Sequence, residues 1–393
     1  MVYLIILILL LYLTYYYDIK NQFSYKNFWY VTIQVLLILL AGLRYRVGGD
    51  TQNYLYFFYH LYPDIHDFSF EDYPIGKDPL YVLVNSLIKS WGGRFYVIQL
   101  LQASFVNILI FHYFKKHSVH IFTCALLYYF LYYTYFSMEI MRASLSIVIC
   151  LYANDYILDR KYVVGYILFF VALLFHTQTL FVFFMPFFFW LKLDKRGILF
   201  LLFAFILGVV IQIKFGSLID LLKLGEALNN KAELYANNDM YSKTAGNINY
   251  VIVFILPMLI YSLLALWYVK RNNKRSQLLK FQPFVMLGAS FLIIQTNVQI
   301  FFRFADYYCI YMVLFISEYF QGIFRNRGQL TRSMSYARAF IVYLPFCFLT
   351  GWKHYRDNPF RFIPYYSILN PAIDHTRENQ TGVIYLQADK KEY

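Results

Sequence analysis

The sequence predicts an all-α protein: a polytopic transmembrane helical bundle of about 12 spans, with long outward-facing loops. Three observations predict this class. The chain of 393 residues is 60% hydrophobic, and its charged side chains gather between long uncharged runs. Many of these runs are long enough to cross a bilayer. We therefore expect residues 1–393 to form a single integral membrane domain.

The uncharged runs predict the individual spans. Runs without Asp, Glu, Lys or Arg occupy residues 1–17, 28–43, 95–114, 118–138, 162–191, 244–269 and 281–302. Shorter or lightly interrupted runs occupy residues 143–158, 198–213, 304–321 and 339–351. One span needs about 20 residues, so the run 162–191 is too long for one and is divided by His176 and Thr177. The first run lacks a basic start and a small-residue cleavage site, which predicts a retained span rather than a signal peptide.

Lys and Arg in alternate loops predict the orientation. Of the 35 basic residues, 18 fall in short loops with few acidic residues. The positive-inside rule places these loops in the cytoplasm and both termini outside. The outward-facing segments are then about 44–94, about 214–248 and a C-terminal tail of about 352–393, and residues 78–93 read as an amphipathic helix at the interface. Because the positive charge lies in loops between spans, we do not expect binding to nucleic acid.

Ionisable side chains at the outward ends of four spans predict a functional site. They are Arg44, Arg46, Glu139, Arg142, His176, Arg303 and Asp306. Charges at membrane depth are costly and usually face a cavity. Several arginines without a D-x-D pattern suggest an anion held by guanidinium groups, which suit phosphate geometry. No cofactor and no metal site is expected, and the four cysteines lie in apolar runs, so they indicate no disulfide framework.

Each of these residues also has a structural explanation. The arginines that end the second span could be snorkelling anchors. The i, i+3 pairs in the fifth and eleventh spans could be intrahelical ion pairs, and His176 could be a hydrogen-bonded core histidine. The 41 Tyr and 41 Phe could stack on sugars, but interfacial aromatic belts explain them equally well. Tyr54, four residues after Asp50, is the best candidate for a sugar contact.

Several segments together resemble the EpsG family. GLRYRVGGDTQNY (42–54) resembles its R-Y-x-x-G-x-D-x-x-x-Y signature, with matches at Arg44, Tyr45, Gly48, Asp50 and Tyr54. MRASLSIVICLYANDYILDRKY (141–162) and LLFHTQTLFVFFMP (173–186) resemble its M-R-x-S-L-A and F-H-x-S/T segments, from which Ser146 and Gln178 depart. RFADYY (303–308) is similar to a late R-x-x-x-Y-F stretch, and NPFRFIPYYSIL (358–369) resembles the closing I-P-Y segment.

The resemblance implies a multi-pass protein of the bacterial cytoplasmic (inner) membrane, similar in role to Wzy polymerases of capsule, O-antigen and exopolysaccharide loci. It implies a metal-independent membrane glycosyltransferase that works at the outer face. The donor would be an undecaprenyl-pyrophosphate-linked glycan and the acceptor a lipid-linked repeat unit. Expected partners are these lipid-linked oligosaccharides, the lipid bilayer, and chain-length regulator or export proteins of the same pathway.

This hypothesis gives each candidate residue a role. The pyrophosphate clamp would be Arg44, Arg142 and Arg303, supported by Arg46. Two tyrosines, Tyr54 and Tyr307, would contact the substrate. The general base would be Asp50, Glu139 or His176, and His176 has the natural pKa for this task.

Two other functions of the same pathway stay open. A lipid-linked oligosaccharide flippase would have a similar number of spans, but its charges should line a cavity open to both sides. A membrane O-acyltransferase would need a histidine that a cytoplasmic acyl donor can reach, whereas His176 is expected to face outward.

Overall fold

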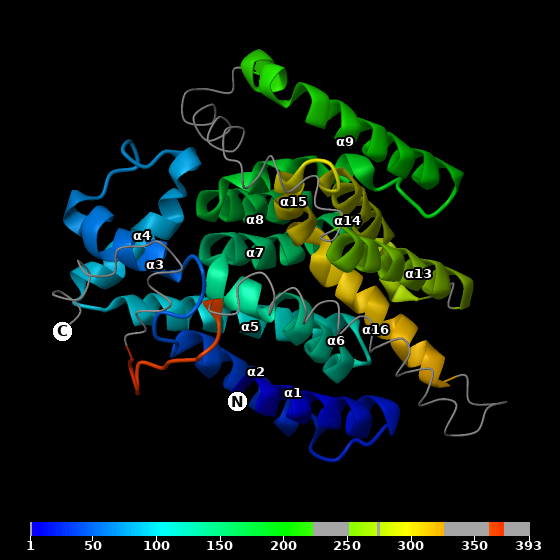
Figure 1. Ribbon diagram of the computed structural model, residues 1–393, viewed down its shortest axis with the longest axis horizontal. Coiled ribbons are helices and arrows are strands. Elements are labelled where there is room, and N and C mark those ends of the chain that lie inside the picture. Colours follow the sequence, from blue (N-terminus) through cyan, green and yellow to red (C-terminus); the bar gives the residue numbers. More distant parts are fainter. Residues whose placement is uncertain (1, 223–250, 273–275, 326–360, 373–393) are drawn as a thin grey trace. The chain divides into compact units, whose positions relative to one another are not determined.

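The computed structural model describes residues 2–222, 251–272, 276–325 and 361–372 (Figure 1). Among them, every regular element is a helix, and the only other pairing is through isolated β-bridges. The all-α class is therefore confirmed. The chain divides into two compact units, Met1–Thr179 with His354–Tyr393 and Leu180–Lys353, and each is considered by itself. The single membrane domain of residues 1–393 stays a prediction, and the predicted span 339–351 lies outside the described residues.

The first unit contains most of the candidate site. Its α-helices are α1 (Val2–Leu13), α2 (Lys26–Gly42), α3 (Thr51–Tyr56), α4 (Pro79–Ser90), α5 (Phe95–His117), α6 (Ile121–Tyr128), α7 (Met141–Leu158) and α8 (Tyr162–Phe175). Its π-helices are η1 (Thr14–Ile19), η2 (Phe57–Leu61), η5 (Tyr129–Tyr133) and η6 (Tyr135–Glu139). Short 3₁₀ turns are η3 (Ile65–Asp67) and η4 (Ile75–Lys77), and η7 (Thr177–Phe188) continues into the second unit.

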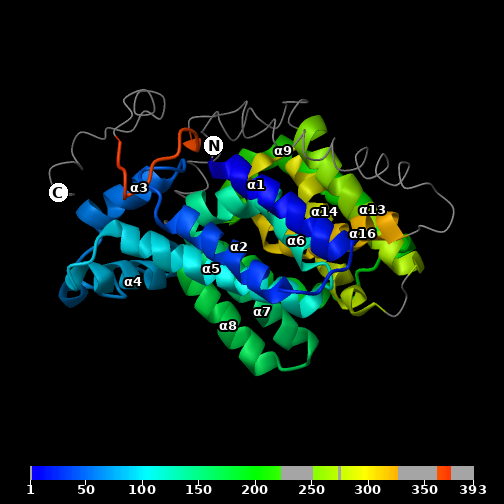
Figure 2. The same cartoon turned by 90° about the horizontal axis from the view of Figure 1, so that it is seen from below.

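Helix α5 is central to the first unit, where it packs against α2, α6 and α7, while α8 packs against α7 (Figure 2). Gly42 at the end of α2 meets Leu100 near the start of α5, so these two helices are antiparallel. Gln102 of α5 donates to Ser144 of α7, and both residues lie near the starts of their helices, so α5 and α7 run parallel. The ends that the loop charges predict to share one side of the membrane therefore lie together.

An ion-pair cluster joins the C-terminal ends of α5 and α7. Asp155 accepts hydrogen bonds from Lys116 Nζ at 2.6 Å and lies 2.8 Å from Nε2 of His117. The carboxylate and the imidazole are buried. These contacts join the two helices at the end remote from the candidate site.

Tyrosine hydroxyls bind backbone carbonyls inside the first unit. Tyr30 donates to the carbonyl of Phe111 at 2.8 Å, and Tyr133 donates to that of Leu37 at 2.6 Å. A buried phenol needs such a partner, because an unsatisfied hydroxyl in an apolar interior is costly. Part of the tyrosine content therefore belongs to the helix interior rather than to an interfacial belt.

The second unit is also helical. Its elements are α9 (Lys195–Leu222), η9 (Val251–Ile255), α13 (Leu256–Asn272), η10 (Gln277–Phe281), α14 (Gln282–Gln295), η11 (Gln299–Phe301), α15 (Phe302–Ala305), η12 (Asp306–Tyr308) and α16 (Cys309–Arg325). Helix α14 packs against α9, α13 and α16. Stacked rings reinforce its contact with α16: the ring centroids of Phe284 and Tyr311 are 4.3 Å apart. Of the predicted outward segment 214–248, the part after Leu222 lies outside the described residues.

Five helices of the described chain are long and apolar enough to cross a membrane. They are Val2–Ile19, Phe95–His117, Lys195–Gln212, Gln277–Gln295 and Gln299–Gly322. Shorter apolar helices are Lys26–Gly42, Ile121–Tyr133, Tyr162–Phe175 and Thr177–Phe188. The predicted break at His176 is confirmed, because α8 ends at Phe175 and η7 begins at Thr177. The count of about 12 spans stays a prediction.

Candidate functional site

Arg44 holds the loop that follows α2. Its side chain is fully buried. Nε donates to the carbonyl of Val47 at 3.0 Å, Nη1 to that of Ala41, and Nη2 to that of Met138 at 3.3 Å. Ala41 and Val47 lie three residues before and after Arg44 in the chain, whereas Met138 belongs to η6. The guanidinium therefore joins this loop to η6. These contacts favour a structural role for Arg44 over direct contact with a pyrophosphate.

A Gly-Gly turn brings this loop against Glu139. Gly48 has a φ of 107°, and a Cβ at this position would lie 2.5 Å from the carbonyl oxygen of Met138. The next amide, that of Gly49, donates to Oε1 of Glu139 at 3.2 Å. Glycine is thus required at the first position by both the backbone conformation and the close approach.

We expect Gly48→Ala to lower the free energy of unfolding by about 1–3 kcal/mol, since it adds a clash to a strained backbone. The matched control is Gly92→Ala. Gly92 also has positive φ, 74°, but no atom lies within 4 Å of its virtual Cβ. The control should cost about 1 kcal/mol, the penalty of the left-handed conformation alone. Thermal unfolding of the solubilised protein measures both; equal shifts would contradict the close approach at Gly48.

A C-terminal segment forms hydrogen bonds with the same loop. The amide of Tyr45 donates to the carbonyl of Tyr366, and that of Gly48 to the carbonyl of Arg361, both at 2.8 Å. Nη1 of Arg361 lies 3.4 Å from Oε1 of Glu139. Sequence reasoning included this segment in the resemblance but gave Arg361 no role, because no local spacing signals a contact between residues 222 positions apart.

Arg142 lies in the first turn of α7 and pairs with Asp78. Nη1 of Arg142 donates to Oδ2 of Asp78 at 2.7 Å. The Arg142 side chain is 30% exposed, whereas that of Asp78 is only 2% exposed. The guanidinium also lies 5.5 Å from the ring centre of Tyr54. Burial raises the pKa of Tyr54, so its phenol stays protonated and the ring presents a neutral π face to the cation.

The same carboxylate reaches the end of α8. Nδ1 of His176 lies 3.6 Å from Oδ2 of Asp78. The amide and the hydroxyl of Thr177 each donate to Oδ1 of Asp78 at 3.1 Å. Nε2 of His176 lies 3.1 Å from Oε1 of Gln178. Asp78 therefore joins the segment before α4 to α7 and to α8.

Sequence reasoning missed Asp78 as a site residue. It appeared only as the first letter of the predicted amphipathic helix 78–93, which the structure shows as α4. An aspartate before a proline is an ordinary helix start, so its position alone indicates no functional contact. Its φ of 56° and ψ of 58° are visible only in the fold.

Three further candidates of the first unit have different surroundings. Arg46 is buried with a φ of 53°, and its guanidinium lies 5.4 Å from the ring centre of Tyr45. Asp50 is exposed at the start of α3. Tyr54 is buried, and its ring packs edge-on against Tyr81 at 5.9 Å. The contacts of Tyr54 with Arg142 and Tyr81 favour a supporting role over sugar stacking.

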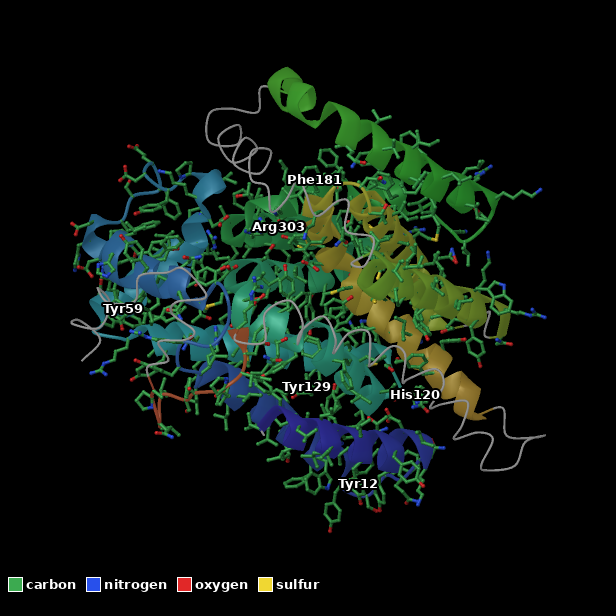
Figure 3. All side chains as sticks on the ribbon, viewed as in Figure 1. Tyr12, Tyr59, His120, Tyr129, Phe181 and Arg303 are labelled. Atoms are coloured by element: carbon green, nitrogen blue, oxygen red, sulfur yellow. The ribbon has the colours of Figure 1, made fainter. Side chains whose placement is uncertain are left out.

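The remaining candidates belong to the second unit. Arg303 lies on α15 (Figure 3), with its guanidinium 5.7 Å from the ring centre of Phe302. Tyr307 is buried in η12. Their predicted participation in one site with Arg142 stays a prediction.

The residues of the GLRYRVGGDTQNY segment thus have distinct tasks in one folded loop: Arg44 holds it, Gly48 turns it and Tyr54 supports Arg142. The sequence model of the EpsG family matches residues 27–367, nearly the whole chain. The chain belongs to the EpsG family. This is a polysaccharide polymerase-like membrane family, so this EpsG protein is a multi-pass membrane protein of polysaccharide biosynthesis. Comparisons with curated proteins and with solved structures give no match.

Proposed function

We propose that this EpsG-family protein is a Wzy-like polysaccharide polymerase of the bacterial cytoplasmic membrane. It transfers a glycan from an undecaprenyl-pyrophosphate-linked donor to a lipid-linked acceptor repeat unit at the outer face. The observations that support this most are two sets of contacts in the first unit between distant parts of the chain: Glu139 pairs with Arg361, and Asp78 pairs with Arg142 and lies 3.6 Å from His176. Cationic and proton-accepting groups are what this transfer requires.

The reaction makes one bond and breaks another. The acceptor hydroxyl oxygen attacks the anomeric carbon of the donor, and the bond from that carbon to the phosphate oxygen breaks. The electron pair leaves with undecaprenyl pyrophosphate, whose negative charge needs stabilisation. The hydroxyl proton passes to a general base.

Arg142 and Arg361 are our candidates for binding the pyrophosphate. Their side chains are 30% and 40% exposed, so each keeps donors open to a ligand. A guanidinium has five N–H donors, and Nε of Arg142 is buried without a hydrogen-bond partner among the described residues. A carboxylate binds each arginine from the protein side, and the N–H groups that it does not use can donate to phosphate oxygens.

His176 is our candidate for the general base. An imidazole is the side chain that most often serves as a general base. Glu139 instead accepts from the Gly49 amide and pairs with Arg361, contacts that orient both side chains. Asp50, exposed beside the same turn, can orient the acceptor hydroxyl.

We expect Arg361→Ala to lower polymerisation by about 10-fold to 100-fold, less than the loss of a fully buried oxyanion donor. Arg361→Lys should retain more activity than Arg361→Ala, because lysine keeps the positive charge. It should stay below wild type, because lysine lacks the paired N–H donors of a guanidinium. The matched control is Arg94→Ala, an exposed arginine at the start of α5 in the same unit. Equal ladders from Arg361→Ala and Arg94→Ala, at equal protein levels, would remove Arg361 from the site.

Deletion of the gene in the native host tests the function against its alternatives. A polymerase predicts that single lipid-linked repeat units accumulate where a membrane-impermeant sugar-oxidising probe reaches them. Repeat units protected from that probe would point to a flippase. Long chains that lack only acyl substituents would point to an O-acyltransferase.

A further inference from the structure

Asp78 is a buried carboxylate at the junction of three chain segments. It lies just before α4, contacts Arg142 at the start of α7, and contacts His176 and Thr177 after α8. These segments are brought together only by the fold. The two oxygens of Asp78 have different partners: Oδ2 contacts Arg142 and His176, and Oδ1 accepts from Thr177.

We propose that Asp78 is a positioning residue that fixes Arg142 and His176 in the orientation needed for glycan transfer. This inference rests on the proposed function. It adds a residue that touches neither substrate nor leaving group and acts through the two that do.

The contact with Arg142 fixes the plane of a guanidinium. An exposed arginine samples many rotamers, and each must be immobilised before two phosphate oxygens can be bound at once. Here the hydrogen bond of 2.7 Å holds one edge of the group, and the Tyr54 ring lies against it at 5.5 Å. The free edge is then oriented before substrate arrives, which is the condition for effective charge stabilisation.

The contact with His176 places a negative charge beside its imidazole. Oδ2 of Asp78 lies 3.6 Å from Nδ1, which has no hydrogen-bond partner among the described residues. Nε2 lies 3.1 Å from Oε1 of Gln178, so both ring nitrogens face oxygen atoms that accept hydrogen bonds. This setting orients the ring and favours the positive charge that it carries once it has taken the proton of an acceptor hydroxyl.

The backbone at Asp78 supports a specific placement rather than a chance contact. A non-glycine residue with φ of 56° and ψ of 58° has an unfavourable conformation. The surrounding bonds hold it there: the amides of Tyr81 and Val82 donate to its carbonyl at 3.0 and 3.2 Å. This conformation directs the side chain toward α7 and α8 while the chain enters α4.

Asp78→Asn separates positioning from folding. Asparagine has the same shape, and its oxygen can still accept both hydrogen bonds from Thr177. Its NH₂ group cannot accept from Arg142 and carries no charge to direct His176. The matched control is Asp155→Asn, which makes the same change in another buried carboxylate that pairs with Lys116 and His117 at the opposite end of α7.

The experiment uses the purified full-length protein in liposomes with lipid-linked repeat units extracted from the deletion host. Turnover is divided by the amount of folded protein measured by size-exclusion chromatography. We expect Asp78→Asn to lower this turnover on the order of 100-fold, the usual effect of misplacing a reacting group. Asp155→Asn should stay within about threefold, because it affects stability at a distant point.

A double-mutant cycle with Arg142→Lys gives a readout that a purely structural role would not move. Lysine has no planar guanidinium for Asp78 to orient. Adding Asp78→Asn to Arg142→Lys should therefore lower turnover much less than the same change in the native background. Equal losses in both backgrounds, or a loss shared by Asp155→Asn, would overturn the positioning role. Wild-type protein that forms no ladder would instead overturn the proposed function and the inference with it.

Discussion

Replacement of Arg142 by alanine should collapse the glycan ladder to a single lipid-linked repeat unit. The guanidinium supplies positive charge where the leaving pyrophosphate develops negative charge, and removal of one such donor typically costs about 100-fold to 1,000-fold in rate. Asp78 at 2.7 Å and the ring of Tyr54 hold this guanidinium in one orientation. The measurement is a gel of lipid-linked glycans from the native host that carries the variant.

Two controls make this result interpretable. Arg142→Ala leaves Asp78 buried without its cation, which alone can destabilise the fold. The double variant Asp78→Asn with Arg142→Ala removes that buried charge, so its melting temperature, compared with that of Arg142→Ala, measures how much the unpaired carboxylate destabilises the fold. Equal membrane levels of all variants are required, and a ladder of normal length from Arg142→Ala would contradict a role in the transfer.

Arg44→Ala should act on stability instead. The change removes three hydrogen bonds from a charged donor to the carbonyls of Ala41, Val47 and Met138. A hydrogen bond that involves a charged group contributes about 1.5–3 kcal/mol, so the loss of three should remove most of the folded protein from the membrane. Thermal unfolding and the amount of monodisperse protein measure this effect.

The comparison with Arg142→Ala separates the two arginines. The predicted pattern is a collapsed ladder from folded protein for Arg142→Ala, and a larger drop in melting temperature for Arg44→Ala than for the Asp78→Asn/Arg142→Ala double variant. Arg94→Ala, which removes an exposed arginine, is the control for both Arg44→Ala and Arg142→Ala. An Arg44→Ala protein that melts normally but forms no ladder would restore the predicted contact between Arg44 and the pyrophosphate.

The sequence was sufficient for the helical class and for which helix ends lie together in the first unit. Apolar runs mark helices directly, because a bilayer requires about 20 residues without charge. The alternation of basic loops predicted which ends belong together, and the ends that carry Glu139, Arg142 and His176 do meet in the first unit. A break at His176 followed from length alone.

The sequence could not separate structural arginines from binding ones. Arg44 and Arg142 look equivalent as charges at span ends, yet one is fully buried against carbonyls and the other is 30% exposed beside a carboxylate. Burial depends on long-range packing, which local patterns do not encode. Asp78 and Arg361 were missed for the same reason, because their partners lie 64 and 222 positions away in the chain.

The central claim is that this EpsG-family protein itself joins lipid-linked repeat units. The most direct test is purified wild-type protein in liposomes with undecaprenyl-pyrophosphate-linked repeat units and no other protein. The account predicts a ladder of integral multiples of the repeat unit, with one undecaprenyl pyrophosphate released for each new linkage. Repeat units that remain single while the protein is folded, or that cross the bilayer without being joined, would contradict it.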